Sequence, residues 1–130
     1  MNDVTREWLL KAEGDLLTAQ RELAAGDRPN FDAACFHAQQ AVEKLMKAVL
    51  IACGEMPPRA HDLVVLNDLV ARHLPGWIWP IEALRFLSRA AVAFRYPGES
   101  AERQDADEAV AIASELCRVL RGRLIELAGN

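Results

Sequence analysis

Four polar side chains that suit phosphate binding recur along one predicted helix. They are His37, Gln40, Lys44 and Lys47, spaced three, four and three residues apart. This spacing places them on one face, because residues three or four apart are neighbours on an α-helix. A histidine and two lysines on one face can together hold a phosphate. The alternative is a solvated face on which Glu43 pairs with Lys47.

A second basic feature stands at the predicted start of a later helix, in the segment Arg59-Ala60-His61-Asp62. A helix N-terminus flanked by arginine and histidine offers a site for an anion. The alternative is simple capping, in which Asp62 accepts backbone N–H bonds and His61 is incidental.

A third feature, Arg95-Tyr96-Pro97-Gly98, follows the fourth predicted helix. On local grounds it is an ordinary helix stop, with Arg95 near the last carbonyl groups. The tetrapeptide by itself assigns no function.

Common enzyme signatures are absent from the sequence. It contains no GxxxxGK[ST] or GxGxxG phosphate loop and no HExxH, and its three histidines are scattered. The cysteines, at positions 35, 53 and 117, show no CxxC or Cys/His ligand spacing, and each fits an apolar helix position. We therefore expect no metal site, no cofactor, and reduced core cysteines in a cytoplasmic protein.

Hydrophobic periodicity and the Gly/Pro clusters predict five helices. Their expected ranges are Asp3–Ala25, Phe31–Cys53, a helix that starts at His61-Asp62-Leu63 and ends near His73, Ile81–Phe94, and Ala101–Ala128. Small residues dominate the apolar stripe of the second helix, which predicts that it lies at the centre of the fold. We expect an all-α, antiparallel up-and-down helical bundle of four to five helices in a single domain spanning residues 1–130.

The composition agrees with this fold class. Of 130 residues, 22 are alanine and 17 are leucine, whereas only 6% are aromatic. The net charge of −4 excludes a protein that coats nucleic acid through bulk positive charge, but it leaves room for a local basic pocket. The first residues lack the pattern of a signal peptide, and the longest apolar stretches are too short to span a bilayer. We therefore expect no membrane association.

Three segments taken together resemble one protein family. They are WLLKAEGDL at 8–16, ACFHAQQAVEKLMKA at 34–48 with His61-Asp62-Leu63 after it, and Arg95-Tyr96-Pro97. In this order and at these intervals the chain resembles the HEPN family, named for nucleotide binding in higher eukaryotes and prokaryotes. The second segment is the most specific, and the resemblance runs from about Trp8 to Leu120.

The resemblance implies a bundle of four main helices plus a short one, and a homodimer with a cleft at its interface. Members are commonly encoded beside a small nucleotidyltransferase as toxin–antitoxin-like pairs. Many members are metal-independent ribonucleases, and their signature is an arginine followed, after four to six residues, by a histidine.

The sequence departs from that signature. Arg95 matches the arginine by position, but Ser100, Ala101 and Glu102 stand where the histidine is expected, and no histidine follows His73. In the ribonuclease the arginine would stabilise the scissile phosphate and the histidine would move the proton. The resemblance therefore transfers a phosphate contact to Arg95, but it transfers no catalytic histidine and leaves enzyme activity open.

The leading hypothesis is a homodimeric, HEPN-like module that binds a nucleotide or nucleic acid and partners a small nucleotidyltransferase. The residues expected to line or border its dimer cleft are His37, Gln40, Lys44, Lys47, Arg95 and Tyr96. Two alternatives remain open: a metal-independent ribonuclease toxin with His37 as an unusual proton carrier, and a purely structural protein-interaction module.

Overall fold

The computed structural model describes residues 1–129, and within them the chain forms five α-helices and no strand. The helices are α1 (Asp3–Ala24), α2 (Phe31–Ala52), α3 (Leu63–His73), α4 (Ile81–Ala93) and α5 (Arg103–Ala128). The predicted all-α bundle is confirmed. None of the described helices is both long and apolar enough to cross a membrane.

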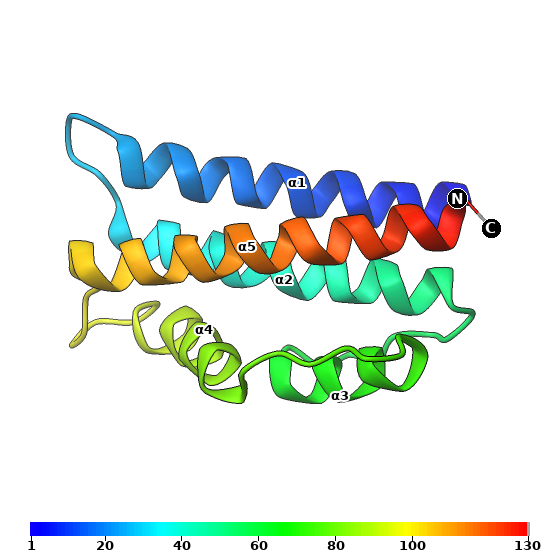
Figure 1. The fold of residues 1–130 in the computed structure, drawn as a ribbon. Coiled ribbons are helices and arrows are strands. Elements are labelled where there is room, and N and C mark those ends of the chain that lie inside the picture. The colour runs from blue at the N-terminus through cyan, green and yellow to red at the C-terminus, as the bar shows by residue number, and fades with distance from the viewer. Residues whose placement is uncertain (130) are drawn as a thin grey trace.

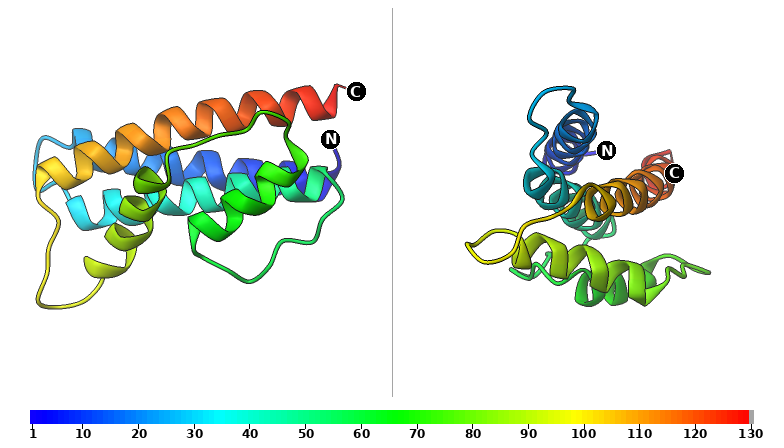
Figure 2. Two further views of the ribbon diagram at one scale, coloured as in Figure 1. Left: turned by 60° about the horizontal axis from the view of Figure 1, so that its bottom comes forward. Right: turned by 90° about the vertical axis from the view of Figure 1, so that its left-hand side faces the viewer.

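The three long helices lie side by side, and the two short ones pack on the opposite side of α2 (Figure 1). α1 runs antiparallel to α2 and to α5, while α3 and α4 carry the chain back between the end of α2 and the start of α5 (Figure 1). Figure 2 shows the α3–α4 pair as a separate layer below the long helices. Because α2 contacts all four other helices, the prediction that it is central is confirmed.

Side-chain caps start three of the helices where the sequence predicts. The side-chain oxygen of Asn2 accepts from the Thr5 backbone N–H at 2.8 Å, and that of Asn30 accepts from Ala33 at 2.9 Å. Asp62 caps α3 by accepting from the Val64 N–H at 2.8 Å. Each cap satisfies a backbone donor that the first turn leaves without a helical partner.

The predicted start of the last helix is wrong by two residues. The backbone N–H of Ala101 donates to the Asp32 carboxylate at 2.6 Å, which ties this segment to the start of α2 instead of to its own helix. Glu102 and Asp105 then form a capping box, so α5 begins at Arg103. The other predicted boundaries lie within one residue of those observed, apart from the start of α3, which falls inside the predicted triplet.

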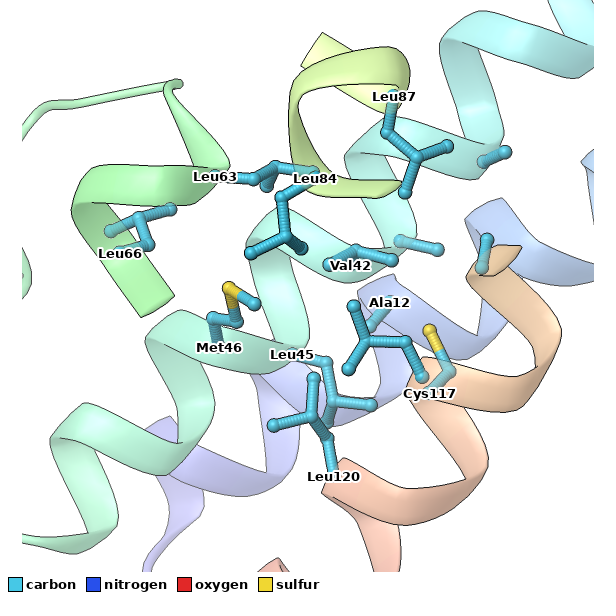
Figure 3. Close-up of a cluster of buried hydrophobic side chains, with 14 of the residues drawn as sticks. Ala12, Val42, Leu45, Met46, Leu63, Leu66, Leu84, Leu87, Cys117 and Leu120 are labelled. Atoms are coloured by element: carbon cyan, nitrogen blue, oxygen red, sulfur yellow. The ribbon is translucent and has the colours of Figure 1, made fainter. Parts of the chain in front are cut away.

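The core is one continuous cluster to which all five helices contribute. Figure 3 labels part of it: Ala12, Val42, Leu45, Met46, Leu63, Leu66, Leu84, Leu87, Cys117 and Leu120. In the loop between α3 and α4, Trp77 is buried and stacks on Trp79, which is itself partly buried against the core. Within the described residues the cysteines are free, as expected.

Candidate functional site

A cavity of about 450 Å³ opens between α2, the start of α3 and the end of α4. Its lining residues are Phe36, Gln39, Gln40, His61, Asp62, Ser88, Ala91, Val92 and Arg95. Polar groups from three separate parts of the chain therefore meet over an apolar floor. This combination suits a small polar ligand that carries a flat apolar part.

Arg95 brings the positive charge of this cavity. It follows the last turn of α4, where its guanidinium lies 5.2 Å from the centre of the Phe36 ring and 5.8 Å from that of Tyr96. Within residues 1–129 it forms no ion pair with a carboxylate. Arginine stacks well on aromatic rings while its N–H groups stay available, so Arg95 is fixed in place and still able to bind an anion.

Glu43 does not line the cavity and is only 4% exposed, but it contacts two residues that do line it, Gln39 and His61. Its carboxylate accepts from Lys47 Nζ and from Gln39 Nε2, each at 3.1 Å. It also lies 3.1 Å from His61 Nδ1 through both of its oxygens. The predicted pairing of Glu43 with Lys47 is confirmed, but the burial of both residues shows that this part of the helix face is not solvated.

His61 is fixed through its backbone as well as its ring. Its carbonyl oxygen accepts from Gln39 Nε2 at 3.0 Å, and the next but one residue, Leu63, donates its N–H to Ser88 Oγ at 3.2 Å. These bonds tie the start of α3 to α2 on one side and to α4 on the other. The capping interpretation of Asp62 is confirmed, but His61 is not incidental, because it contacts Glu43.

Lys47 extends the Glu43 network away from the cavity. It is 6% exposed, and its ammonium lies 5.9 Å from the centre of the Trp8 ring on α1. Its charge is therefore satisfied by Glu43 and by an aromatic face.

His37 and Lys44 lie against α1, where both contact the same carboxylate. Asp15 accepts from Lys44 Nζ at 2.6 Å and lies 2.9 Å from His37 Nδ1. Neither residue lines the α2–α4 cavity. The helical stripe predicted from the sequence is thus divided between two carboxylates.

The structure brings together only part of the predicted residue set. Gln40 and Arg95 line the cavity, and Tyr96 adjoins Arg95 with 63% of its surface exposed. The sequence analysis did not single out five residues of the cavity wall, which are Phe36, Gln39, Ser88, Ala91 and Val92. Gln39, Glu43 and Lys47 form an i, i+4, i+8 row, and this polar row next to the apolar stripe was the available signal.

A second cavity of similar volume, about 450 Å³, lies between α1 and α5 and is lined mainly by apolar groups such as Leu16 and Ile125. The arginines on its rim are already paired, Arg121 with Glu13 at 3.0 Å and Arg118 with Glu115 at 2.6 Å. The α2–α4 cavity is therefore the better candidate for binding an anion.

Comparison with known proteins assigns the family. The sequence model of the HEPN domain matches residues 5–123, which is most of the chain. The chain belongs to the HEPN family. The matched range includes every residue that lines the α2–α4 cavity, so this cavity is part of the HEPN domain itself.

Two solved structures share the HEPN bundle of this chain. TT1696 from Thermus thermophilus is 29% identical with a TM-score of 0.74, over 93% of this chain and 98% of that one. ST0689, an archaeal HEPN homologue, is 23% identical with a TM-score of 0.64, over 92% of this chain and 97% of that one. No curated protein matches the sequence. Among the described residues of this HEPN domain, no group of three or more His, Cys, Asp or Glu side chains could hold a metal ion.

Proposed function

We propose that this HEPN domain binds the phosphate of a nucleotide or of RNA in the α2–α4 cavity. The observation that carries the proposal is Arg95, a stacked guanidinium without an ion pair among residues 1–129, in a cavity that also holds Gln40 and His61. Arginine binds phosphate through two parallel N–H bonds, which add both affinity and orientation. The Phe36 ring in the same cavity offers a face on which a base can stack.

The test compares two arginines, one within α4 and one just after its end. Arg95→Ala removes the cavity cation, whereas Arg85→Ala removes an α4 arginine that pairs with Glu82 and does not line the cavity. Binding of ATP and of a fluorescein-labelled oligoribonucleotide would be measured by calorimetry and by fluorescence anisotropy. Arg95→Ala should raise Kd about 10- to 100-fold, the effect of losing a charge-assisted hydrogen bond of about 1.5–3 kcal/mol. Equal Kd values for the two variants would reject the cavity as the binding site.

Lys44 provides an independent check on the location of the site. Because Asp15 already neutralises it at 2.6 Å, Lys44→Ala should leave Kd within about threefold of the wild-type value. A loss as large as that of Arg95→Ala would move the site to the α1–α2 face, with His37 and Lys47 as its neighbours.

We also propose, on the strength of family membership, that the protein is a homodimer and pairs with a small nucleotidyltransferase in a toxin–antitoxin-like system. Exposed apolar groups stand beside the cavity, with Val92 62% exposed and Tyr96 63% exposed. A second copy that covered them would close the cavity into a cleft. Native mass spectrometry of the protein purified gently from its own host tests both parts. Two chains plus a second polypeptide of nucleotidyltransferase size would support the proposal, whereas a dimer with neither partner nor nucleotide would favour a purely structural interaction module.

A further inference from the structure

We propose that the groove between α1 and α5 is a self-association surface, on which a second copy of this chain packs about a two-fold axis parallel to the two helices. The groove is the second cavity, of about 450 Å³, and it shares no lining residue with the α2–α4 cavity. The surface is independent of the proposed function, because it needs no ligand and lies away from Val92 and Tyr96, where the cleft of a dimer is proposed.

The floor of the groove is apolar and open. Its members come from α1, α2 and α5, and they are Ala12, Leu16, Leu45 and Cys117. Gly122 of α5 also lines the groove, and a Cβ atom added there would meet no atom within 4 Å. Glycine is a poor helix former, and at this position it leaves room for another chain to approach closely.

Exposed apolar side chains border the groove on both helices. On α1, Leu10 and Leu17 are 61% and 45% exposed, and they lie three residues before and four residues after Glu13, which lines the groove. Residues at this spacing share one stripe of a helix. On α5, Ile125 lines the groove and is 52% exposed. A continuous apolar surface of this kind on a soluble protein marks a site of interaction with another protein.

Two contacts across the groove set the register between α1 and α5. Glu13 pairs with Arg121 at 3.0 Å, and Gln20 Nε2 donates to Ser114 Oγ at 3.2 Å. The two helices are antiparallel (Figure 1), and these contacts show that each step forward along α1 matches one step back along α5. Residues 10 and 17 of α1 are therefore level with residues 124 and 117 of α5.

This register makes the surface complementary to itself. A two-fold axis along the groove lays α1 of each copy over α5 of the other and keeps every residue at its own level. Leu10 of the second copy then meets Ile125, and Leu17 of the second copy enters the apolar floor. Glu13 of the second copy meets Arg121, so opposite charges also lie together. Apolar groups face apolar groups and each charge faces its opposite, which is why a second copy is the occupant that fits.

The first experiment measures the mass of the assembly by size-exclusion chromatography with light scattering, over a range of protein concentrations. Leu17→Glu places a charge in the apolar contact and should weaken self-association about 10-fold or more, so that the mass is halved where the wild type is associated. The matched control is Val65→Glu, because Val65 on α3 is also 45% exposed but does not line the groove. This control should keep the wild-type mass. A monomeric wild type, or equal masses for the two variants, would overturn the proposal.

The second experiment reverses charges to test whether the contact is between copies. Glu13 and Arg121 are 43% and 57% exposed, so the folded chain should tolerate each reversal, as circular dichroism would show. Glu13→Arg and Arg121→Glu should each associate about 10-fold more weakly than the wild type, because like charges then meet at two symmetric places. An equimolar mixture of the two variants should regain the wild-type mass, since each chain supplies the charge that the other lacks. A mixture that associates as weakly as its components would overturn the proposal.

The same measurements separate this surface from the dimer proposed at the α2–α4 cavity. With both interfaces present the wild type forms a tetramer, and Leu17→Glu reduces it to a dimer in which the Arg95-dependent binding of ATP is unchanged. A wild-type dimer whose mass Leu17→Glu leaves unchanged would reject the groove and leave the proposed function standing.

Discussion

Replacing Glu43 by leucine should lower the free energy of unfolding by about 3–5 kcal/mol, because it leaves the charge of Lys47 buried without its partner. The two residues are 4% and 6% exposed, and Lys47 Nζ lies 3.1 Å from the Glu43 carboxylate. The remaining neighbour of that ammonium is the Trp8 ring at 5.9 Å, which is a weak substitute. A domain of this size has a total stability of about 5–15 kcal/mol, so the loss is a large share of the whole.

Removing the other partner of this ion pair should lower the free energy of unfolding by less. Lys47→Met leaves Glu43 with Gln39 and His61, each at 3.1 Å, so the carboxylate keeps part of its stabilisation. The double variant Glu43→Leu/Lys47→Met removes both charges and should be less damaging than Glu43→Leu alone. We therefore expect Glu43→Leu to cause the largest loss of stability, and Lys47→Met and the double variant each to cause a smaller loss.

Urea denaturation followed by circular dichroism at 222 nm measures all three variants, and wild-type denaturation slopes would show that the comparison is valid. The conservative control is Arg118→Met, which breaks an exposed ion pair with Glu115 and should change the stability by less than about 1 kcal/mol. If Glu43→Leu costs no more than this control, the reasoning from a buried charge network is refuted.

Three further predictions concern thiol chemistry, a buried hydrogen bond and a helical glycine. Burial raises the pKa of the Cys35 and Cys117 thiols to about 12. At pH 8 only about one in 10,000 of these thiols is then a thiolate. Ellman's reagent should therefore label at most the remaining cysteine, Cys53, until guanidinium unfolds the chain. Rapid labelling of more than one thiol in the native protein would contradict this. Asn67→Leu should cost about 1–3 kcal/mol in urea denaturation, since Trp77 Nε1 loses its 2.8 Å acceptor; a neutral effect would contradict the bond's role. Gly14→Ala should stabilise the protein by about 0.5–1 kcal/mol in the same assay, because the new methyl group would meet no atom within 4 Å; destabilisation would show that something covers this position.

The sequence predicts the helices well because local signals agree with each other. Caps at Asn30 and Asp62 and the prolines after α2 all lie where the hydrophobic period changes. The start of α5 escapes such reasoning, since it depends on a bond from Ala101 to Asp32, which lies 69 residues earlier. Local patterns carry no information on such a tertiary contact.

The candidate site is only partly predictable for the same reason. A helical face shows that His37, Gln40 and Lys44 are neighbours, but it does not show which helix packs against them. Asp15 on α1 binds His37 and Lys44. The segment before α3 instead contacts the neighbouring residue Gln39, through the His61 carbonyl. The cavity forms where α2, α3 and α4 meet, so its membership follows from packing and not from spacing along one helix.

The position of the cavity at the seam between two layers links binding to local unfolding. α3 and α4 have 11 and 13 residues, a length at which isolated helices are marginal in water, so packing against α2 must hold them in place. A ligand that contacts α2, His61 and Arg95 at once connects the layer of α3 and α4 to the layer of long helices. At a concentration 100 times its Kd it would raise the cost of separating them by about 2.7 kcal/mol. Occupancy of the cavity would then be visible as slower amide hydrogen exchange in α3 and α4, while the exchange of α1 would stay unchanged.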